Sequence, residues 1–141
     1  MIVVLLLLDM AYQAVLIAAL GSSSMAAFSA PNMRASRPRC LIGGYLVGVF
    51  IGCSIALLVD ATAGLNVLDE HLVRILAGAV ATGLAMFVMV VTDTEHPPAA
   101  ALALGFVLNE WNLITIFAVM SGITIIVLIK EAFRGRLVDL L

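Results

Sequence analysis

The amino-acid sequence predicts an all-α membrane protein, and three observations support this fold class. Of the 141 residues, 64% are hydrophobic and only 11% are charged, whereas soluble domains are about half apolar and about a quarter charged. The mean hydropathy is +1.21. Four apolar runs, at residues 2–20, 41–59, 72–91 and 113–129, are each near the roughly 20 residues that a helix needs to cross a bilayer. Any functional site is therefore expected in or beside the membrane.

The four long runs leave no segment long enough for a soluble domain, so residues 1–141 are predicted to form one membrane domain. Its first half spans residues 1–59, its second half residues 72–130, and a polar tail covers residues 131–141. The net charge is −2 and the basic residues are scattered, which excludes a nucleic-acid surface. The first eight residues lack the basic start of a signal peptide and are interpreted as membrane helix, although this first helix could be incomplete.

Two shorter segments between the long runs are predicted to be broken or half-length helices. Residues 21–39 and 92–111 each contain an apolar stretch interrupted by proline and polar residues. The boundary of the first one is open, because Asp9, Tyr12 and Gln13 could form a turn that is followed by a helix over residues 14–28.

The basic residues favour a topology in which both short segments cross the membrane rather than re-enter it. If both cross, six of the seven basic residues lie on one side and only Arg74 lies on the other. Basic residues gather on the cytoplasmic side. The six are Arg34, Arg37, Arg39, Lys130, Arg134 and Arg136. This arrangement predicts two inverted three-pass repeats, as in many transporters, in a prokaryotic plasma (inner) membrane with the C-terminal tail in the cytoplasm.

The most polar interruption is the run from Thr92 to Pro98, which places two acids and a histidine between hydrophobic helices. Ionisable groups at membrane depth are costly and are candidates for function. Proline suits the first turn of a helix, so a helix is predicted to begin at Pro97, with its N–H groups and positive dipole end beside His96. The predicted binding residues are Thr92, Asp93, Thr94, Glu95, His96, Pro97 and Pro98.

A plain interfacial loop, capped by threonine or aspartate, is the alternative interpretation of this run. A metal site is not predicted, because histidine and cysteine do not occur at ligand spacing. No cofactor fingerprint is present either. The chain is therefore not expected to be an enzyme, although His96 with Asp93 or Glu95 could in principle exchange protons.

Gly21 and the three serines after it form the corresponding break in the first half. Hydroxyl groups can bind an anion without a fixed charge, so Ser22, Ser23 and Ser24 are predicted to line the same site. The alternative is that these serines pack closely and bond to carbonyls of their own helix.

Gly44, Gly48 and Gly52 recur every four residues and predict a flat helix face that another backbone can approach closely. The partner helix could belong to the same chain or to a second copy. Because so small a bundle often needs a second copy to enclose a pathway, a homo-oligomer through this face is expected.

The sequence resembles the HPP family, small integral membrane proteins named for a His-Pro-Pro triplet that stands here at His96 to Pro98. Further matching features are the glycine-and-serine break, Phe-Ser-Ala-Pro at residues 28–31, Arg-Pro-Arg at residues 37–39 and the Gly-Gly pair at residues 43–44. Family members often have histidine after that pair, where this chain has Tyr45. The resemblance implies nitrite transport, because plant chloroplast and cyanobacterial relatives are linked to moving nitrite.

The expected function is therefore a transporter or channel for a small monovalent anion, nitrite, bound between the two helix starts. Asp93 and Glu95 would repel an anion unless one is protonated, paired with Arg34 or Arg37, or used to couple proton movement. A proton or cation pathway through these two acids is the main alternative. A structural membrane subunit is a further one.

Overall fold

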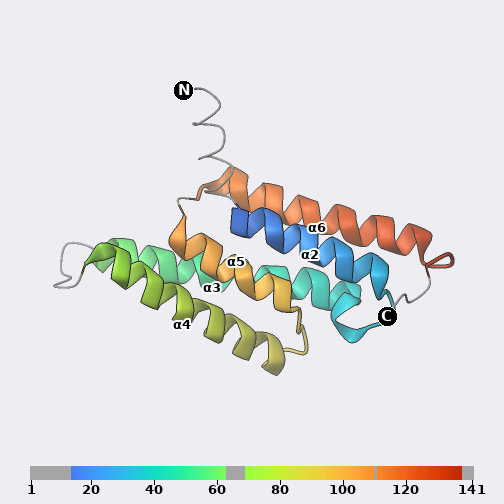
Figure 1. Ribbon diagram of the computed structural model, residues 1–141, viewed down its shortest axis with the longest axis horizontal. Coiled ribbons are helices and arrows are strands. Elements are labelled where there is room, and N and C mark those ends of the chain that lie inside the picture. The colour runs from blue at the N-terminus through green and yellow to red at the C-terminus, as the bar shows by residue number, and fades with distance from the viewer. Residues whose placement is uncertain (1–13, 63–68, 110, 138–141) are drawn as a thin grey trace.

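The computed structural model describes residues 14–62, 69–109 and 111–137, and in these residues it is entirely helical (Figure 1). Three of the described helices are long and apolar enough to cross a membrane. They are α3 (Pro38–Thr62), α4 (Glu70–Val91) and α6 (Leu113–Phe133). Two shorter helices, α2 (Ala14–Ser29) and α5 (Pro97–Leu108), and one 3₁₀ turn, η1 (Arg34–Ser36), complete the described part. The all-α class is confirmed.

The prediction of four long helices is confirmed for three of them. Of the first apolar run, residues 14–20 form the start of α2 and the remainder lies outside the described residues. A helix break at Gly21 to Ser24 was the wrong expectation, because α2 continues through all four residues. The alternative helix over residues 14–28 matches α2 closely.

Helix α2 continues through the serines because a serine hydroxyl can form its hydrogen bond inside a helix. The hydroxyls of Ser22, Ser23 and Ser24 each lie 2.8–2.9 Å from the carbonyl four residues earlier. Such bonds place a polar group in apolar surroundings without interrupting the backbone. A serine cluster therefore does not by itself end a membrane helix.

The predicted start of a helix at Pro97 is confirmed. Helix α4 ends at Val91, and α5 begins at Pro97 with His96 in extended conformation as its N-cap. Between them Asp93 adopts a positive φ of 57°, a conformation that aspartate tolerates better than most residues. This tight turn brings the chain from the end of α4 directly into the bundle.

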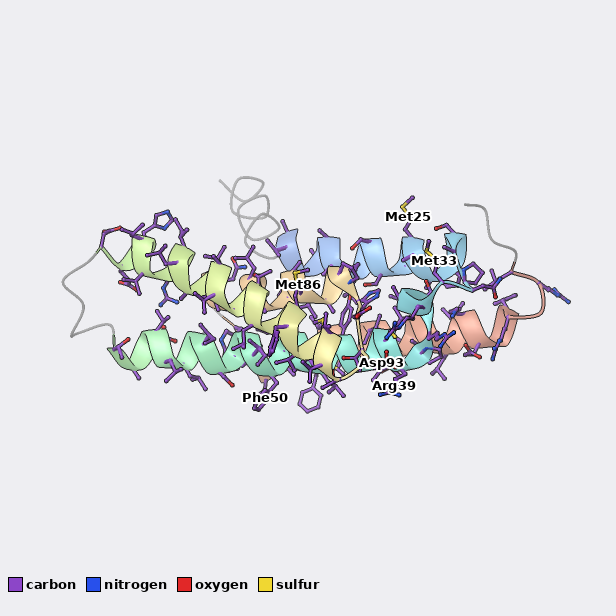
Figure 2. All side chains as sticks on the ribbon, turned by 90° about the horizontal axis from the view of Figure 1, so that it is seen from below. Met25, Met33, Arg39, Phe50, Met86 and Asp93 are labelled. Carbon is purple, nitrogen blue, oxygen red and sulfur yellow. The ribbon has the colours of Figure 1, made fainter. Side chains whose placement is uncertain are left out.

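Helix α5 lies in the middle of the bundle, with α3 and α4 on one side and α2 and α6 on the other (Figure 1). Its core side chains Leu102, Phe106 and Val107 are fully buried. In contrast, Phe50 on α3 and Phe117 on α6 are 71% and 72% exposed, and Figure 2 shows Phe50 pointing away from the bundle. Large apolar side chains on the outside are what a lipid-facing surface requires.

The glycine face of α3 is confirmed, but its partner is α5 of the same chain. A Cβ on Gly44 would meet His96, one on Gly48 would meet Ala99, and one on Gly52 would meet Ala103. The two helices therefore run in the same direction and touch backbone to backbone. A homo-oligomer through Gly44, Gly48 and Gly52 was a wrong expectation, because that face is already covered.

The two ends of the bundle differ in charge as the crossing topology predicts. Lys130 Nζ donates to the Ser36 carbonyl at 2.6 Å, so the end of α6 lies beside η1 and the three nearby arginines. Arg74 lies at the opposite end, where it pairs with Asp60 and donates to the carbonyl of Val107 near the end of α5. Helix α5, with 12 residues, thus runs from beside η1 toward the end that holds Arg74.

Candidate functional site

His96 is buried at the start of α5, and both of its ring nitrogens have partners. Nε2 lies 2.7 Å from Ser23 Oγ of α2, and Nδ1 lies 2.9 Å from the carbonyl oxygen of Ala35 in η1. The residue is 1% exposed. A carbonyl only accepts hydrogen bonds, so Nδ1 carries a proton. His96 therefore joins α5 to α2 and η1 from inside the bundle.

Ser23 is the centre of this buried cluster. Its hydroxyl lies 2.8 Å from Tyr45 Oη of α3 and 2.8 Å from the Ala19 carbonyl, in addition to the contact with His96. The rings of Tyr45 and His96 are 5.9 Å apart and tilted. A hydroxyl donates one hydrogen bond and accepts two, so these three neighbours account for the full capacity of Ser23.

The hydrogen bonds of the cluster are consistent with two arrangements of its protons. With a cationic ring, His96 Nε2–H and Tyr45 O–H both donate to Ser23, and Ser23 donates to Ala19. With a neutral ring, the Ser23 hydroxyl turns and donates to Nε2, while Tyr45 still donates to Ser23. Either state keeps the imidazole bonded, and the rotation of one hydroxyl accompanies the loss of the proton. The cluster can thus accommodate His96 in either protonation state.

The three predicted serines therefore have different environments. Only Ser23 faces His96, whereas Ser22 is exposed and Ser24 is half-buried, and both bond to their own helix. The three environments differ because consecutive side chains of an α-helix point about 100° apart.

The predicted N–H donors at the start of α5 are largely missing. Pro97 and Pro98 have no N–H, and the N–H of Ala99 donates to the His96 carbonyl at 2.9 Å. The expectation that free backbone N–H groups of this helix start face an anion is thus corrected for its first three residues. The positive end of the helix dipole is retained, and side chains must supply the hydrogen bonds.

Asp93 lies outside the buried cluster and forms ion pairs at the surface. Its carboxylate bonds to Arg34 of η1, and Arg39 Nη1 of α3 lies 3.8 Å from it. Arg39 also donates to the Thr92 carbonyl at 3.0 Å. Figure 2 shows Asp93 and Arg39 close together at this end. Pairing with arginine, one of the arrangements considered for the two acids, is the arrangement found for Asp93.

The Asp93→Asn variant is expected to change the free energy of unfolding by less than about 1 kcal/mol, because these ion pairs are half exposed and screened by solvent. Asparagine also tolerates the positive φ at this position. Thermal unfolding of the purified variant in detergent, followed by size-exclusion chromatography, measures the change. A loss comparable with that of a buried cluster residue would contradict a surface role for Asp93.

The remaining predicted residues surround His96 from the α4 side. Thr94 is buried against Gly43 of α3, and its hydroxyl lies 2.8 Å from that of Thr92. Glu95, His96 and Pro97 line a mainly apolar cavity of about 210 Å³ together with Met86, Met89 and Val90. The histidine therefore has an apolar cavity on one side and the polar cluster on the other. In the described ranges, no group of three histidine, cysteine or acidic side chains is placed to hold a metal.

Sequence reasoning missed Lys130, which it counted among the basic residues on one side of the membrane but did not assign to the site. Lys130 is 4% exposed, and its ammonium donates to the Ser36 carbonyl. Successive carbonyls of η1, those of Ala35 and Ser36, are thus held by His96 and Lys130. A periodic signal was present, since Val119, Ile123 and Val127 form the buried face of α6 and Lys130 continues it at helical spacing.

Helices with lipid-facing apolar side chains around a buried polar cluster define a helical integral membrane protein. A family model described as HPP, transmembrane region, matches residues 1–135. The chain therefore belongs to the HPP family of membrane proteins, as its His-Pro-Pro triplet suggested. No curated protein matches the chain. No solved structure matches it either.

Proposed function

We propose that this protein is a transporter for a small monovalent anion, nitrite, and not an enzyme. The observation that supports the proposal is the buried cluster of His96, Ser23 and Tyr45, in which every hydrogen bond is satisfied when the imidazole is cationic. A fixed or switchable cation at membrane depth attracts anions and repels cations.

Lys130 adds a second buried cation close to the first along η1. In the described part of the chain no carboxylate lies within salt-bridge distance of Lys130 or His96. Asp93, one of the two acids of the predicted site, is paired with Arg34. The positive charge of the cluster is therefore left for a mobile anion. It attracts nitrite through space, because every N–H and O–H group of His96, Ser23 and Tyr45 already has a partner in the cluster.

The arrangement of the short helices supports the two inverted repeats. Leu16 of α2 packs on Gly105 near the end of α5, and Ser23 in the second half of α2 contacts His96 at the start of α5. The two short helices therefore run antiparallel through the centre, and each is followed by a long helix. We propose that the arginine-rich end faces the cytoplasm of a prokaryotic cell, and that any homo-oligomer uses a face other than the glycine face.

A proton pathway is the second candidate, because Glu95 lines the same cavity as His96. A carboxylate and an imidazole can pass a proton between them. In this alternative the cavity on the α4 side, and not the Ser23 cluster, would be the route.

The Ser23→Ala variant is expected to lower nitrite flux into proteoliposomes about tenfold, because a bond to a charged group contributes about 1.5–3 kcal/mol. Ser22→Ala is the matched control, since within the described residues the Ser22 hydroxyl donates to carbonyls of its own helix. Chloride and proton flux are measured beside nitrite, and protein-free liposomes correct for uncharged nitrous acid that crosses lipid unaided.

Nitrite-selective flux that falls in Ser23→Ala and not in Ser22→Ala supports the proposal. Folded wild-type protein that moves protons but no nitrite would overturn it in favour of the Glu95 route. Equal loss in both serine variants would also count against the cluster as the anion site.

A further inference from the structure

A second cavity, which is polar and has a volume of about 260 Å³, lies at the arginine-rich end between the start of α3 and the end of α6. Its charged lining residues are Arg37, Lys130, Glu131 and Arg134. None of them belongs to the His96 cluster. The sequence motifs of the predicted site also leave this cavity unassigned.

The cavity carries an excess of positive charge. Its one described carboxylate, Glu131, is bound by Arg134 at 3.3 Å, so Arg37 and Lys130 remain as unbalanced cations. An ammonium has three N–H donors, and within residues 14–62, 69–109 and 111–137 Lys130 gives one of them to Ser36. A nearly buried lysine with spare donors on the wall of a polar cavity is suited to bind an anion.

The cavity is connected to the buried histidine through η1. Lys130 holds the Ser36 carbonyl, and the preceding carbonyl, that of Ala35, accepts from His96 Nδ1. The Ser36 hydroxyl fixes the same turn to α2 through the Ala26 carbonyl at 2.9 Å. An anion that draws the Lys130 ammonium away from Ser36 acts on the same short turn that orients His96.

We infer that this cavity is a loading site for a small singly charged oxyanion, where the anion is collected before it reaches His96. The inference rests on the proposed function, because it names the entry of the same pathway. Arg37 attracts the anion from solution, and Lys130 receives it at the inner wall. The phosphodiester of a lipid headgroup shares this chemistry, so the test separates the two sources.

The test measures nitrite flux against nitrite concentration in neutral phosphatidylcholine liposomes. Arg37→Gln and Lys130→Gln are each expected to raise the half-saturating concentration about fivefold, because a unit charge about 4 Å away retains that influence even in water-like surroundings. The maximal rate is expected to change little. Arg136→Gln is the matched control, since Arg136 is exposed at the same end and does not line the cavity.

Ionic strength provides an independent readout. Raising the salt from about 0.01 M to about 0.5 M shortens the Debye length several-fold, so the difference between wild type and Arg37→Gln is expected to shrink. A sulfate salt that is not transported serves for this purpose. Arg37 is exposed, so its variant remains informative even if Lys130→Gln does not fold.

Unchanged half-saturation in folded Arg37→Gln and Lys130→Gln would overturn the loading site and leave the nitrite proposal standing, because wild-type flux is measured in the same experiment. Phosphatidylglycerol liposomes distinguish the lipid source. An effect of the variants that appears only with this anionic lipid would assign the cavity to a headgroup and overturn the inference. The same fivefold effect in both lipids supports it.

Discussion

The His96→Ala variant is expected to reduce nitrite flux to the level of protein-free liposomes and to lower the free energy of unfolding by about 3 kcal/mol. Removal of the ring leaves the Ala35 carbonyl without its histidine partner and takes one of three partners from the Ser23 hydroxyl. An unsatisfied buried group costs about 1–3 kcal/mol. It also removes the one side chain of the cluster that can carry a positive charge. Thermal unfolding in detergent measures the loss of stability, and the proteoliposome assay measures the loss of nitrite flux.

His71→Ala is the control for this prediction, because His71 is exposed at the start of α4. Its stability and flux should match the wild type. His96→Gln separates the two effects, since an amide can retain part of the hydrogen bonding but cannot carry the charge. Full nitrite flux in His96→Ala would show that the histidine is structural, and the anion site would then have to lie elsewhere.

Gly48→Ala is expected to cost about 3 kcal/mol or more and to prevent normal assembly of the bundle. A Cβ at this position would lie 2.3 Å from the backbone oxygen of Ala99, far inside contact distance. Backbone atoms cannot rotate away as a side chain can, so α3 and α5 must separate, and overpacking of this kind costs about 1–3 kcal/mol even where side chains relax. Loss of the monodisperse peak in size-exclusion chromatography after mild heating would report the change.

Gly83→Ala serves as the matched control for Gly48→Ala. Gly83 is also in the interior of a long helix, but no atom of another element lies within 4 Å of the position of its Cβ. Alanine is the better helix former, so this variant should be as stable as the wild type. If Gly48→Ala were equally stable, the close contact between α3 and α5 would be incorrect.

Composition and hydropathy were sufficient to predict the class of the protein and three of its helices. The runs at residues 41–59, 72–91 and 113–129 correspond to α3, α4 and α6, whose observed ends extend the predicted ones by a few residues. Long apolar runs are reliable because a lipid-exposed backbone must satisfy its hydrogen bonds within the helix. The start of α5 was predictable for a similar local reason, since paired prolines can only begin a helix there.

Short polar interruptions were less informative, because such a segment can either break the helix or stay helical with its side chains bonded to the backbone. Ser22 to Ser24 were expected to break a helix and instead bond to their own backbone. The run from Thr92 to His96 does break one. The difference is proline, which removes a donor and excludes the helical conformation of the residue before it, whereas serine removes nothing.

By itself the sequence determined that this chain is a helical membrane protein of the HPP family, and it singled out His96 as an ionisable residue in a hydrophobic region. The tertiary structure alone decided which groups His96 meets. Ser23, Tyr45 and Ala35 come from three other elements, and their approach depends on α3 and α5 touching through glycine. The pairing of Asp93 with Arg34 and the burial of Lys130 likewise depend on contacts between distant segments, because local periodicity specifies the buried face of a helix but not the polar group opposite it.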